Sequence, residues 1–473
     1  MRCRWHPLPR DRKWRAHVPY AYVSRSAQLA ALLWTVLAGV GVATAQSSSG
    51  QEREPFSLAS LGIKGQATFK NFSYFQQTPN DHQNFFEGAV LQLEWARRFA
   101  DWGSMKFVVD AQGDTAGFAE GVTFQIPETS RHRSVLNVKE ATTSLRKGPL
   151  EVTLGKQIYA WGTGDAFNPT DNINPYDYLD VLDNEKMGVY SAAARLNAGP
   201  ASLMFVVIPF FTPSRLPLPD SRWTPVPPSG LTGIVEGRQL PSQDVGNMQY
   251  AGRAKATVGG WDFSASYFDG FKPTPSFRLS TVEVAPGTSL PAFTPVFTRL
   301  RIAGFDFSTT FGKFEVHGEG AFKLVVANGR DDLFQGLAGF NYSWDGLGFR
   351  WLDQITLIVE YGLEFTLYSR PGSNILPPGN APLVGDLLAD NAFRNGAVAR
   401  IQFKLTEDTQ LKLTGVGDFD GSPSSYAQIK LTHRLSDKFQ AEAGLDFLTG
   451  ARDSFWGRWR DNDRFFFLFK FFF

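Results

Sequence analysis

A segment between Tyr159 and Lys186 holds a dense group of oxygen-bearing side chains. Lys186 is its only basic residue, so the segment carries a marked negative charge. Its acidic and amide residues are Asp165, Asn168, Asp171, Asn172, Asn174, Asp177, Asp180, Asp183, Asn184 and Glu185. Carboxylates grouped in this way could bind a hard cation, or could set up an electric field that acts on passing ions.

Two interpretations of this segment remain open. Asp and Asn next to Pro or Gly cap turns with their own side chains, so the segment could be a rigid, self-bonded loop. It could equally be a loop whose charge acts on a solute. Calcium binding is less favoured, because no D-x-[DN]-x-[DN]-G run with a closing Glu occurs. We therefore predict no metal site and no cofactor.

The residue types needed for catalysis do not gather in this sequence. After residue 45 the histidines occur singly, at His82, His132, His317 and His433. No G-x-S-x-G, H-E-x-x-H or P-loop motif is present. The only cysteine is Cys3, which excludes disulfides, thiolate metal sites and covalently attached haem. We predict no catalytic residues and no enzyme activity.

The stretch Asn462–Phe473 indicates which kind of element positions these side chains. Side chains alternate between the two faces of a strand. One face would carry Phe465, Phe467, Phe469, Phe471 and Phe473. The other would carry Arg464, Phe466, Leu468, Lys470 and Phe472. This pattern is typical of a barrel strand with lipid on one side and a wetter interior on the other; a buried strand of a soluble sandwich is the alternative.

Residues 1–45 have the form of a secretory signal peptide and are set apart from the fold. They contain seven Lys or Arg residues, one Asp, an apolar run from Leu29 to Ala45 and a final Ala-Thr-Ala before Gln46. Without them 40 basic residues face 45 acidic ones, a net charge of about −5, which gives no indication of nucleic-acid binding. Residues 46–59 form a short polar lead-in, and residues 60–473 are predicted to form one domain.

The rest of the sequence has no candidate for a membrane-spanning helix. Its longest apolar run, Leu203–Phe211, has nine residues, whereas a membrane helix needs about 20. A closed β-barrel is the other structure that satisfies the backbone in lipid. Alternation bounded by turn residues gives eighteen candidate strands, with sixteen as the alternative. Their spans are 60–75, 84–98, 103–113, 133–146, 150–158, 187–197, 201–209, 247–258, 260–271, 297–310, 312–324, 332–344, 352–367, 393–406, 409–419, 424–435, 437–448 and 462–473.

The connections between these strands alternate in length. Every connection after an even-numbered strand is a short turn, such as Gly259-Gly260 or Ser436-Asp437. The connections after odd-numbered strands include long stretches rich in Pro, Gly, Asp and Asn, at 114–132, 159–186, 210–246, 272–296, 368–392 and 449–461. Membrane barrels place short turns in the periplasm and long loops outside. We predict an all-β, antiparallel, up-and-down transmembrane barrel.

Basic residues fall on the faces of three late strands that alternation assigns to the barrel interior. They are Arg400, Lys404, Lys412, Lys430 and Arg434. We interpret them as a basic lumen wall that faces the acidic segment 159–186. The alternative is that they pair with Glu442, Asp446 and Asp418 and so fill the lumen.

Several of these features resemble outer-membrane porins. The motif G-K-Q-x(3)-W-G-x-G-D-x(2)-N-P-T-D begins at Gly155, and N-P-x-D-Y begins at Asn174. This pattern is similar to that of porin-like barrels of Gram-negative bacteria, and the strand number resembles the alginate-export porins, whose basic uptake motif is not matched. The resemblance implies that the third external loop enters the lumen and forms a constriction. The residues implied are Trp161, Asp165, Asn168, Asp171, Asn174, Asp177 and Asp180.

The end of the sequence also resembles such barrels. Phe473, preceded by Phe471 and Phe469, is similar to the signal that the outer-membrane assembly machinery recognises. This resemblance implies the outer membrane of a Gram-negative cell. Residues 1–45 contain no Arg-Arg pair, which favours the general secretory pathway over the twin-Arg one. The expected partners are outer-membrane lipid, the barrel assembly machinery and small polar solutes, with no nucleic acid and with the oligomeric state left open.

The function expected from these observations is an outer-membrane channel for passive diffusion of small polar or anionic solutes. An export conduit or structural sheath for a partner complex is the alternative, and the partner would be a polysaccharide-export machine or a periplasmic electron carrier. A barrel hydrolase is a third possibility. A channel should conduct alone, a sheath should be closed without its partner, and a hydrolase should turn over lipid or peptide substrates.

Overall fold

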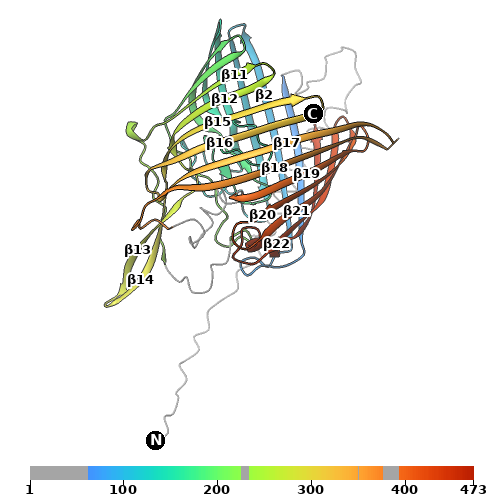
Figure 1. The fold of residues 1–473 in the computed structure, drawn as a ribbon. Coiled ribbons are helices and arrows are strands. Elements are labelled where there is room, and N and C mark those ends of the chain that lie inside the picture. The colour runs from blue at the N-terminus through green and yellow to red at the C-terminus, as the bar shows by residue number, and fades with distance from the viewer. Residues whose placement is uncertain (1–61, 225–233, 350, 377–393) are drawn as a thin grey trace, which may run out of the picture.

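The computed structural model describes residues 62–224, 234–349, 351–376 and 394–473. These residues form one eighteen-stranded sheet with almost no helix. The sheet is rolled into a barrel, and a hairpin of two further strands, β13 and β14, projects from one end (Figure 1). The predicted signal peptide, residues 1–45, and the lead-in, residues 46–59, lie outside the described residues.

Each barrel strand runs antiparallel to its neighbours, in the order of the sequence. β1 pairs with β2 on one side and with β23 on the other, so the sheet closes on itself. Eighteen strands were predicted, and eighteen are found within a few residues of the expected bounds. They are β1 (Ile63–Tyr74), β2 (Phe85–Ala100), β3 (Gly103–Asp114), β4 (Leu136–Lys147), β5 (Leu150–Gln157), β8 (Val189–Ala198), β9 (Ala201–Ile208), β11 (Gln249–Val258), β12 (Trp261–Phe271), β15 (Arg299–Phe311), β16 (Phe314–Ala327), β17 (Asp331–Phe349), β18 (Leu352–Ser369), β19 (Asn395–Lys404), β20 (Thr409–Asp418), β21 (Ser424–Ser436), β22 (Phe439–Gly450) and β23 (Arg464–Phe472).

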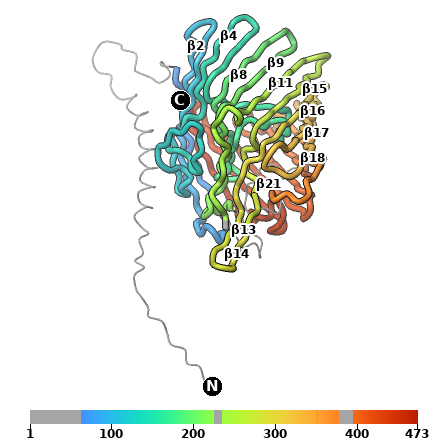
Figure 2. Tube along the Cα trace, turned by 90° about the vertical axis from the view of Figure 1, so that its left-hand side faces the viewer, coloured from blue at the N-terminus to red at the C-terminus, as the bar shows by residue number. Residues whose placement is uncertain are grey.

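Short turns gather at one end of the barrel, the turn end, and long loops at the other, the loop end (Figure 2). Gly199 and Gly259 stand in two of the turns with φ of 57° and 60°, a left-handed conformation that glycine adopts at no steric cost. Gly65 and Phe473 exchange two backbone hydrogen bonds of 2.9 and 3.0 Å at the turn end. The predicted alternation of short and long connections is therefore confirmed.

The long loops carry structure that the sequence did not predict. β13 (Ser276–Ala285) and β14 (Thr288–Val296) pair around Gly287, and β14 also pairs in parallel with β10 (Ile234–Val235). Residues 272–296 were predicted as a long connection and are one, but the hairpin within it was not predicted, because Pro291 and Pro295 interrupt the usual strand signal without preventing the pairing. The other short elements are the strands β6 (Tyr176–Asp177) and β7 (Glu185–Lys186) and the 3-10 turns η3 (Val245–Asn247) and η4 (Gly457–Asn462).

The two faces of β23 differ as predicted. Arg464 and Lys470 point inward, where both form ion pairs with other interior side chains. Phe465 is exposed on the outer surface, and the rings of Phe469 and Phe471 contact β22 on that surface. These rings therefore lie where lipid contact is expected, and their role as an assembly signal stays a prediction.

The outer surface carries an apolar band over the other strands as well. Large exposed side chains on this band include Phe107, Leu154, Leu203, Phe205, Phe263, Phe305, Phe322, Tyr361 and Phe365. Within the described ranges, none of the helical segments has the length and apolar character needed to cross a bilayer. Exposed aromatic and aliphatic side chains in such number would be costly in water, so the band is the face that lies against lipid.

A pair of substitutions in β20 tests this assignment of faces. Leu413 lies on the outward face at mid-strand, and Thr414 follows it on the inward face. A charge on the lipid face at mid-membrane costs about 2–4 kcal/mol, and one on the lumen face costs little. We expect Leu413→Arg to impair insertion, and Thr414→Arg to fold normally, as measured by heat-modifiable electrophoretic mobility. Equal tolerance of the two changes would mean that the faces are assigned wrongly.

Candidate functional site

The acidic segment folds into the barrel interior. It joins β5 to β8 and comprises residues 158–188, which we call the inner loop. At its tip the N–H of Gly164 donates to Glu319 of β16 at 2.7 Å. The hydroxyl of Thr170 donates to the same carboxylate at 2.9 Å. The loop tip therefore contacts β16, a strand that lies far around the barrel wall from β5.

A second interior carboxylate, Glu360 of β18, holds the next two residues of the tip. The N–H groups of Asp165 and Ala166 donate to it at 2.5 and 2.9 Å. Glu360 is 1% exposed and Glu319 is 4% exposed. A buried carboxylate costs free energy unless its oxygens accept hydrogen bonds, so the loop N–H groups stabilise both residues and are fixed by them in turn.

Sequence reasoning did not identify Glu319 or Glu360 as site residues. A signal was present, because Glu315, His317 and Glu319 stand at alternate positions of β16 and so share its interior face. Three polar residues at that spacing mark a face turned away from lipid. Their partner in the loop lies 155 residues earlier in the chain, and no local pattern specifies such a contact.

The second half of the inner loop is tied to another part of the wall by ion pairs. Asp180 Oδ2 lies 2.6 Å from Arg464 of β23, and Asp183 Oδ2 lies 2.6 Å from Lys70 of β1. The strands β19 to β22 separate these contacts from those at β18. The inner loop therefore crosses the interior and is held at several points around the wall.

Asp177 and Asp171 also have basic partners. Asp177 accepts from Arg133 and Arg215 at 2.9 and 2.8 Å, and Asp171 pairs with Lys186. Burial acts to raise the pKa of Asp177, but the two guanidinium groups outweigh it and hold that pKa well below its usual range. Burial raises the pKa of Asp171 despite the nearby Lys186. Much of the negative charge of the loop is therefore neutralised locally.

The pKa of Asp177 predicts how acid affects the inner loop. A carboxyl whose pKa falls on folding stabilises the folded state above its unfolded pKa of about 3.9, and this stabilisation is lost as the pH falls through the lowered value. We expect Asp177→Asn to reduce the free energy of unfolding by about 2–3 kcal/mol at pH 7. The difference from the wild type should persist to about pH 5 and shrink below about pH 4. Urea unfolding in detergent measures this difference in the free energy of unfolding. A difference that vanishes by pH 6 would contradict the lowered pKa of Asp177.

The other residues proposed for a constriction shape the loop. The side-chain oxygen of Asn174 accepts from the N–H of Tyr159 at 2.7 Å, and that of Asn168 accepts from the N–H of Gly164 at 2.9 Å. Trp161 is 6% exposed and packs against the barrel wall. These bonds favour the rigid-loop interpretation for the amides. Among the acidic residues proposed for the constriction, Asp165 is the one that stays well exposed, at 34% of its side chain.

Two apolar clusters occupy parts of the interior. The first joins the inner loop to the wall at β8 to β16, and its members include Tyr159, Trp161, Ile173, Val189, Val206, Ala251, Phe268 and Ile302. The second lies near the loop end and joins the inner loop and other loops to β1, β2, β19, β20, β22 and β23; its members include Phe72, Leu179, Trp223, Val398, Val416, Leu448, Trp459 and Phe466. The interior is therefore more apolar than the alternation of the strands indicates.

Three of the five residues predicted for a basic wall lie together. Arg400, Lys412 and Lys430 stand on the neighbouring strands β19, β20 and β21, and we call them the basic strip. Arg400 lies 3.7 Å from Asp165 of the inner loop, and Lys430 lies 3.2 Å from Glu442. Lys412 forms no ion pair with a described residue, and the charged groups that act on it are Lys430, Arg400 and Glu442. The strip is therefore only partly neutralised.

The other two predicted wall residues lie towards the turn end. Lys404 is 3.7 Å from Asp353, and Arg434 is 2.6 Å from Asp408. All four side chains are at least 39% exposed. Exposed pairs of this kind contribute little free energy and are screened by salt. Lys404 and Arg434 therefore contact different acidic residues from those that the basic strip contacts.

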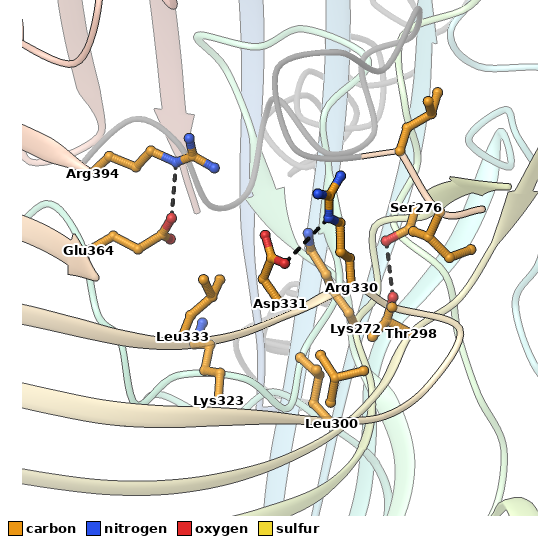
Figure 3. Close-up of a pocket in the computed structure, with 14 residues that line it drawn as sticks. Lys272, Ser276, Thr298, Leu300, Lys323, Arg330, Asp331, Leu333, Glu364 and Arg394 are labelled. Atoms are coloured by element: carbon orange, nitrogen blue, oxygen red, sulfur yellow. Dashed lines mark hydrogen bonds and ion pairs between the residues drawn. The ribbon is translucent and has the colours of Figure 1, made fainter. Parts of the chain in front are cut away.

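A cavity of about 60 Å³ opens at the loop end, between the β13 hairpin and the ends of β15 to β18 (Figure 3). Arg394 lies 2.9 Å from Glu364 across it, and Arg330 lies 3.6 Å from Asp331. Its charged lining residues are Lys272, Lys323, Arg330, Arg394, Asp331 and Glu364. Basic side chains therefore outnumber acidic ones in this lining.

Comparison with protein-family models finds no match, and comparison with curated proteins finds none. Among solved structures, the outer membrane protein OpdK from Pseudomonas aeruginosa is 9% identical, with 87% of this chain and 98% of that chain covered and a TM-score of 0.48. OccK11 (OpdR) from the same organism is 10% identical, with 87% and 95% covered and a TM-score of 0.47. A BenF-like porin from Pseudomonas fluorescens is 8% identical, with 87% and 98% covered and a TM-score of 0.46.

Proposed function

We propose that this protein is an outer-membrane channel for the passive diffusion of small anionic solutes. The basic strip is the observation that supports this most. Lys412 has two basic groups, Lys430 and Arg400, and one acidic group, Glu442, as charged neighbours, and it forms no ion pair with a described residue. Like charges placed together inside a protein repel one another unless water or anions compensate them. The strip therefore favours a wetted interior that attracts anions.

The proposed route begins at the cavity of the loop end. Arg394 lines this cavity and directly precedes β19. Arg400 follows on the same strand, facing Asp165 at the tip of the inner loop at 3.7 Å. Lys412 and Lys430 continue the line of basic groups towards the turn end. An anion that follows this line meets Arg394, Arg400, Lys412 and Lys430 in turn, with Val398 of the apolar cluster between the first two.

Selection along this route would come from width and from charge. The inner loop is held on both sides of the interior, at Glu360 and at Arg464, so its position is fixed and it would narrow the passage. Arg400 and Asp165 present opposite charges at its tip. A narrow passage lined by fixed charges discriminates between ions through the free energy of entering it. No covalent step and no cofactor is required.

The outer membrane is the proposed location. The apolar outer band would lie against lipid, with the turn end towards the periplasm and the loop end outside. We also propose that the protein is exported through the general secretory pathway. The assembly machinery would then recognise Phe469, Phe471 and Phe473. The outward position of Phe469 and Phe471 on β23 supports the last point.

A structural sheath or export conduit is the second candidate, and one observation favours it. Trp223 and Trp459, from two different loops, are at most 1% exposed within the apolar cluster at the loop end. The indole N–H of Trp459 donates to the carbonyl of Trp223 at 2.8 Å. A plug of this kind could keep the barrel closed until a partner engages the loops.

Conductance of the purified protein distinguishes the candidates. We expect stepwise currents when the protein alone is added to a planar lipid bilayer. A sheath would insert and stay silent, although its electrophoretic mobility shows a folded barrel. A hydrolase would turn over lipid or peptide substrates without conducting. Silence from correctly folded protein would rule out the proposed channel.

A further inference from the structure

A group of potential metal ligands lies beside the tip of the inner loop. It consists of Asp165 on the loop, His317 on β16 and Glu360 on β18, and one ligand atom of each lies within 4.8 Å of the others. His317 Nε2 and Glu360 Oε1 are 3.0 Å apart. Metal-to-ligand bonds of about 2.0–2.2 Å place two ligand atoms of one ion about 3–4 Å apart. A small movement of the exposed Asp165 side chain would bring all three into that range.

The barrel wall is shaped to bring His317 and Glu360 together. Gly339 of β17 stands directly between them, paired with His317 on one side and with Glu360 on the other. A Cβ atom at this position would lie 2.4 Å from His317 Nε2 and 2.8 Å from Glu360 Cγ. Because Gly339 has no side chain, it leaves room for the imidazole of His317 and the carboxylate of Glu360 to meet across β17.

The Asp165 side chain is not needed to anchor the loop. The N–H of Asp165, rather than its carboxylate, forms the bond to Glu360. Among the described residues the carboxylate itself makes only long contacts, at 3.4 Å to Asn341 and 3.7 Å to Arg400, and it is 34% exposed. It is therefore held weakly, next to the buried His317 and Glu360, and it can be reached from the interior.

The local charge also suits a cation. Glu315 and Glu319 flank His317 on the same face of β16, so two further carboxylates stand near the group, and Arg400 is a basic residue that contacts it, at 3.7 Å from Asp165. Each ionised carboxylate has about four lone-pair sites, so Glu360 can keep its loop N–H donors while it binds an ion. A neutral imidazole ligand favours zinc and similar transition ions over calcium or magnesium.

We propose that Asp165, His317 and Glu360 form a binding site for a divalent transition-metal ion such as zinc. His317 would bind through Nε2 and the two carboxylates through oxygen, with water completing the coordination. Such an ion would tie the tip of the inner loop to β16 and β18.

Calorimetric titration with zinc tests the proposal. Protein without a histidine tag is purified in detergent, freed of metal with a chelator and titrated with zinc chloride. We expect saturable binding of one ion per chain. His317→Gln, which keeps a polar group beside Glu360, and Asp165→Asn, at an exposed position, should each weaken binding by more than about 100-fold.

His433→Gln provides the matched control. His433 lies on β21 beside Thr409, away from the proposed ligands, and its replacement should leave zinc binding unchanged. Absence of saturable binding to the wild type, or unchanged binding in Asp165→Asn and His317→Gln, would overturn the proposal. If His317→Gln does not fold, Asp165→Asn still decides. Calorimetry reports binding alone, so its result is independent of whether the barrel conducts.

Discussion

Replacement of Arg464 by Met is expected to reduce the free energy of unfolding by about 3–5 kcal/mol. Arg464 of β23 is 3% exposed; its Nε donates to Asp446 at 2.8 Å and its Nη1 donates to Asp180 at 2.6 Å. Methionine fills much of the same space without charge. Two carboxylates would then remain buried without their counter-ion, and a buried charge that has lost its partner is strongly destabilising.

The matched control is Arg452→Met. Arg452 pairs with Asp461 at 2.7 Å, but its side chain is 55% exposed, and exposed pairs contribute about 0–1 kcal/mol. Urea unfolding in detergent compares the variants, and limited proteolysis reports on the inner loop, which Asp180 anchors. We expect residues 158–188 to become sensitive to the protease in Arg464→Met and to stay resistant in Arg452→Met. Unfolding free energies for the two variants within about 1 kcal/mol of each other would contradict this account of the buried pair.

Replacement of Lys412 by Glu is expected to remove or reverse the preference of the channel for anions. A unit charge about 8 Å from a passing ion contributes about 1 kcal/mol at an effective dielectric constant of about 40, between bulk water and a protein surface. Reversal of the sign doubles the difference to about 2 kcal/mol before screening by salt. We expect the permeability ratio of chloride to potassium to fall about tenfold at about 0.1 M salt.

Lys438→Glu makes the same change of charge outside the lumen. Lys438 lies in the exposed turn between β21 and β22, where bulk salt screens charges beyond about 10 Å at 0.1 M. The reversal potential of the Lys438→Glu channel should match that of the wild type. If Lys412→Glu also matches the wild type while both variants fold and conduct, ions do not pass the basic strip.

The barrel itself could be predicted from local patterns. The aromatic alternation of β23, the two-residue turns at Gly199-Pro200 and Gly259-Gly260 and the long loops between them depend on residues close together in the chain. A period of two and a turn residue in a left-handed conformation are properties of a few neighbouring residues. The hairpin at 276–296 was missed because its prolines weaken that same local signal.

The contacts of the inner loop could not be predicted in this way. The acidic character of residues 159–186 was evident, but the ion pair of Asp180 with Arg464 joins residues 284 positions apart. Which carboxylate is buried and paired, as Asp177 is, and which stays exposed, as Asp165 does, follows from the path of the loop across the barrel. Closure of the barrel sets that path, and closure is not encoded in any short segment.

The reversal potential of the wild-type channel tests the central claim most directly. Purified protein is inserted into a planar bilayer with a tenfold gradient of potassium chloride, and the voltage of zero current is measured. Because the basic strip is only partly neutralised, we expect chloride to pass more readily than potassium, and the reversal potential should have the sign that this preference produces. The potential should be larger at low salt, because screening is weaker there. A potential of the opposite sign, or the absence of current from folded protein, would contradict an anion channel.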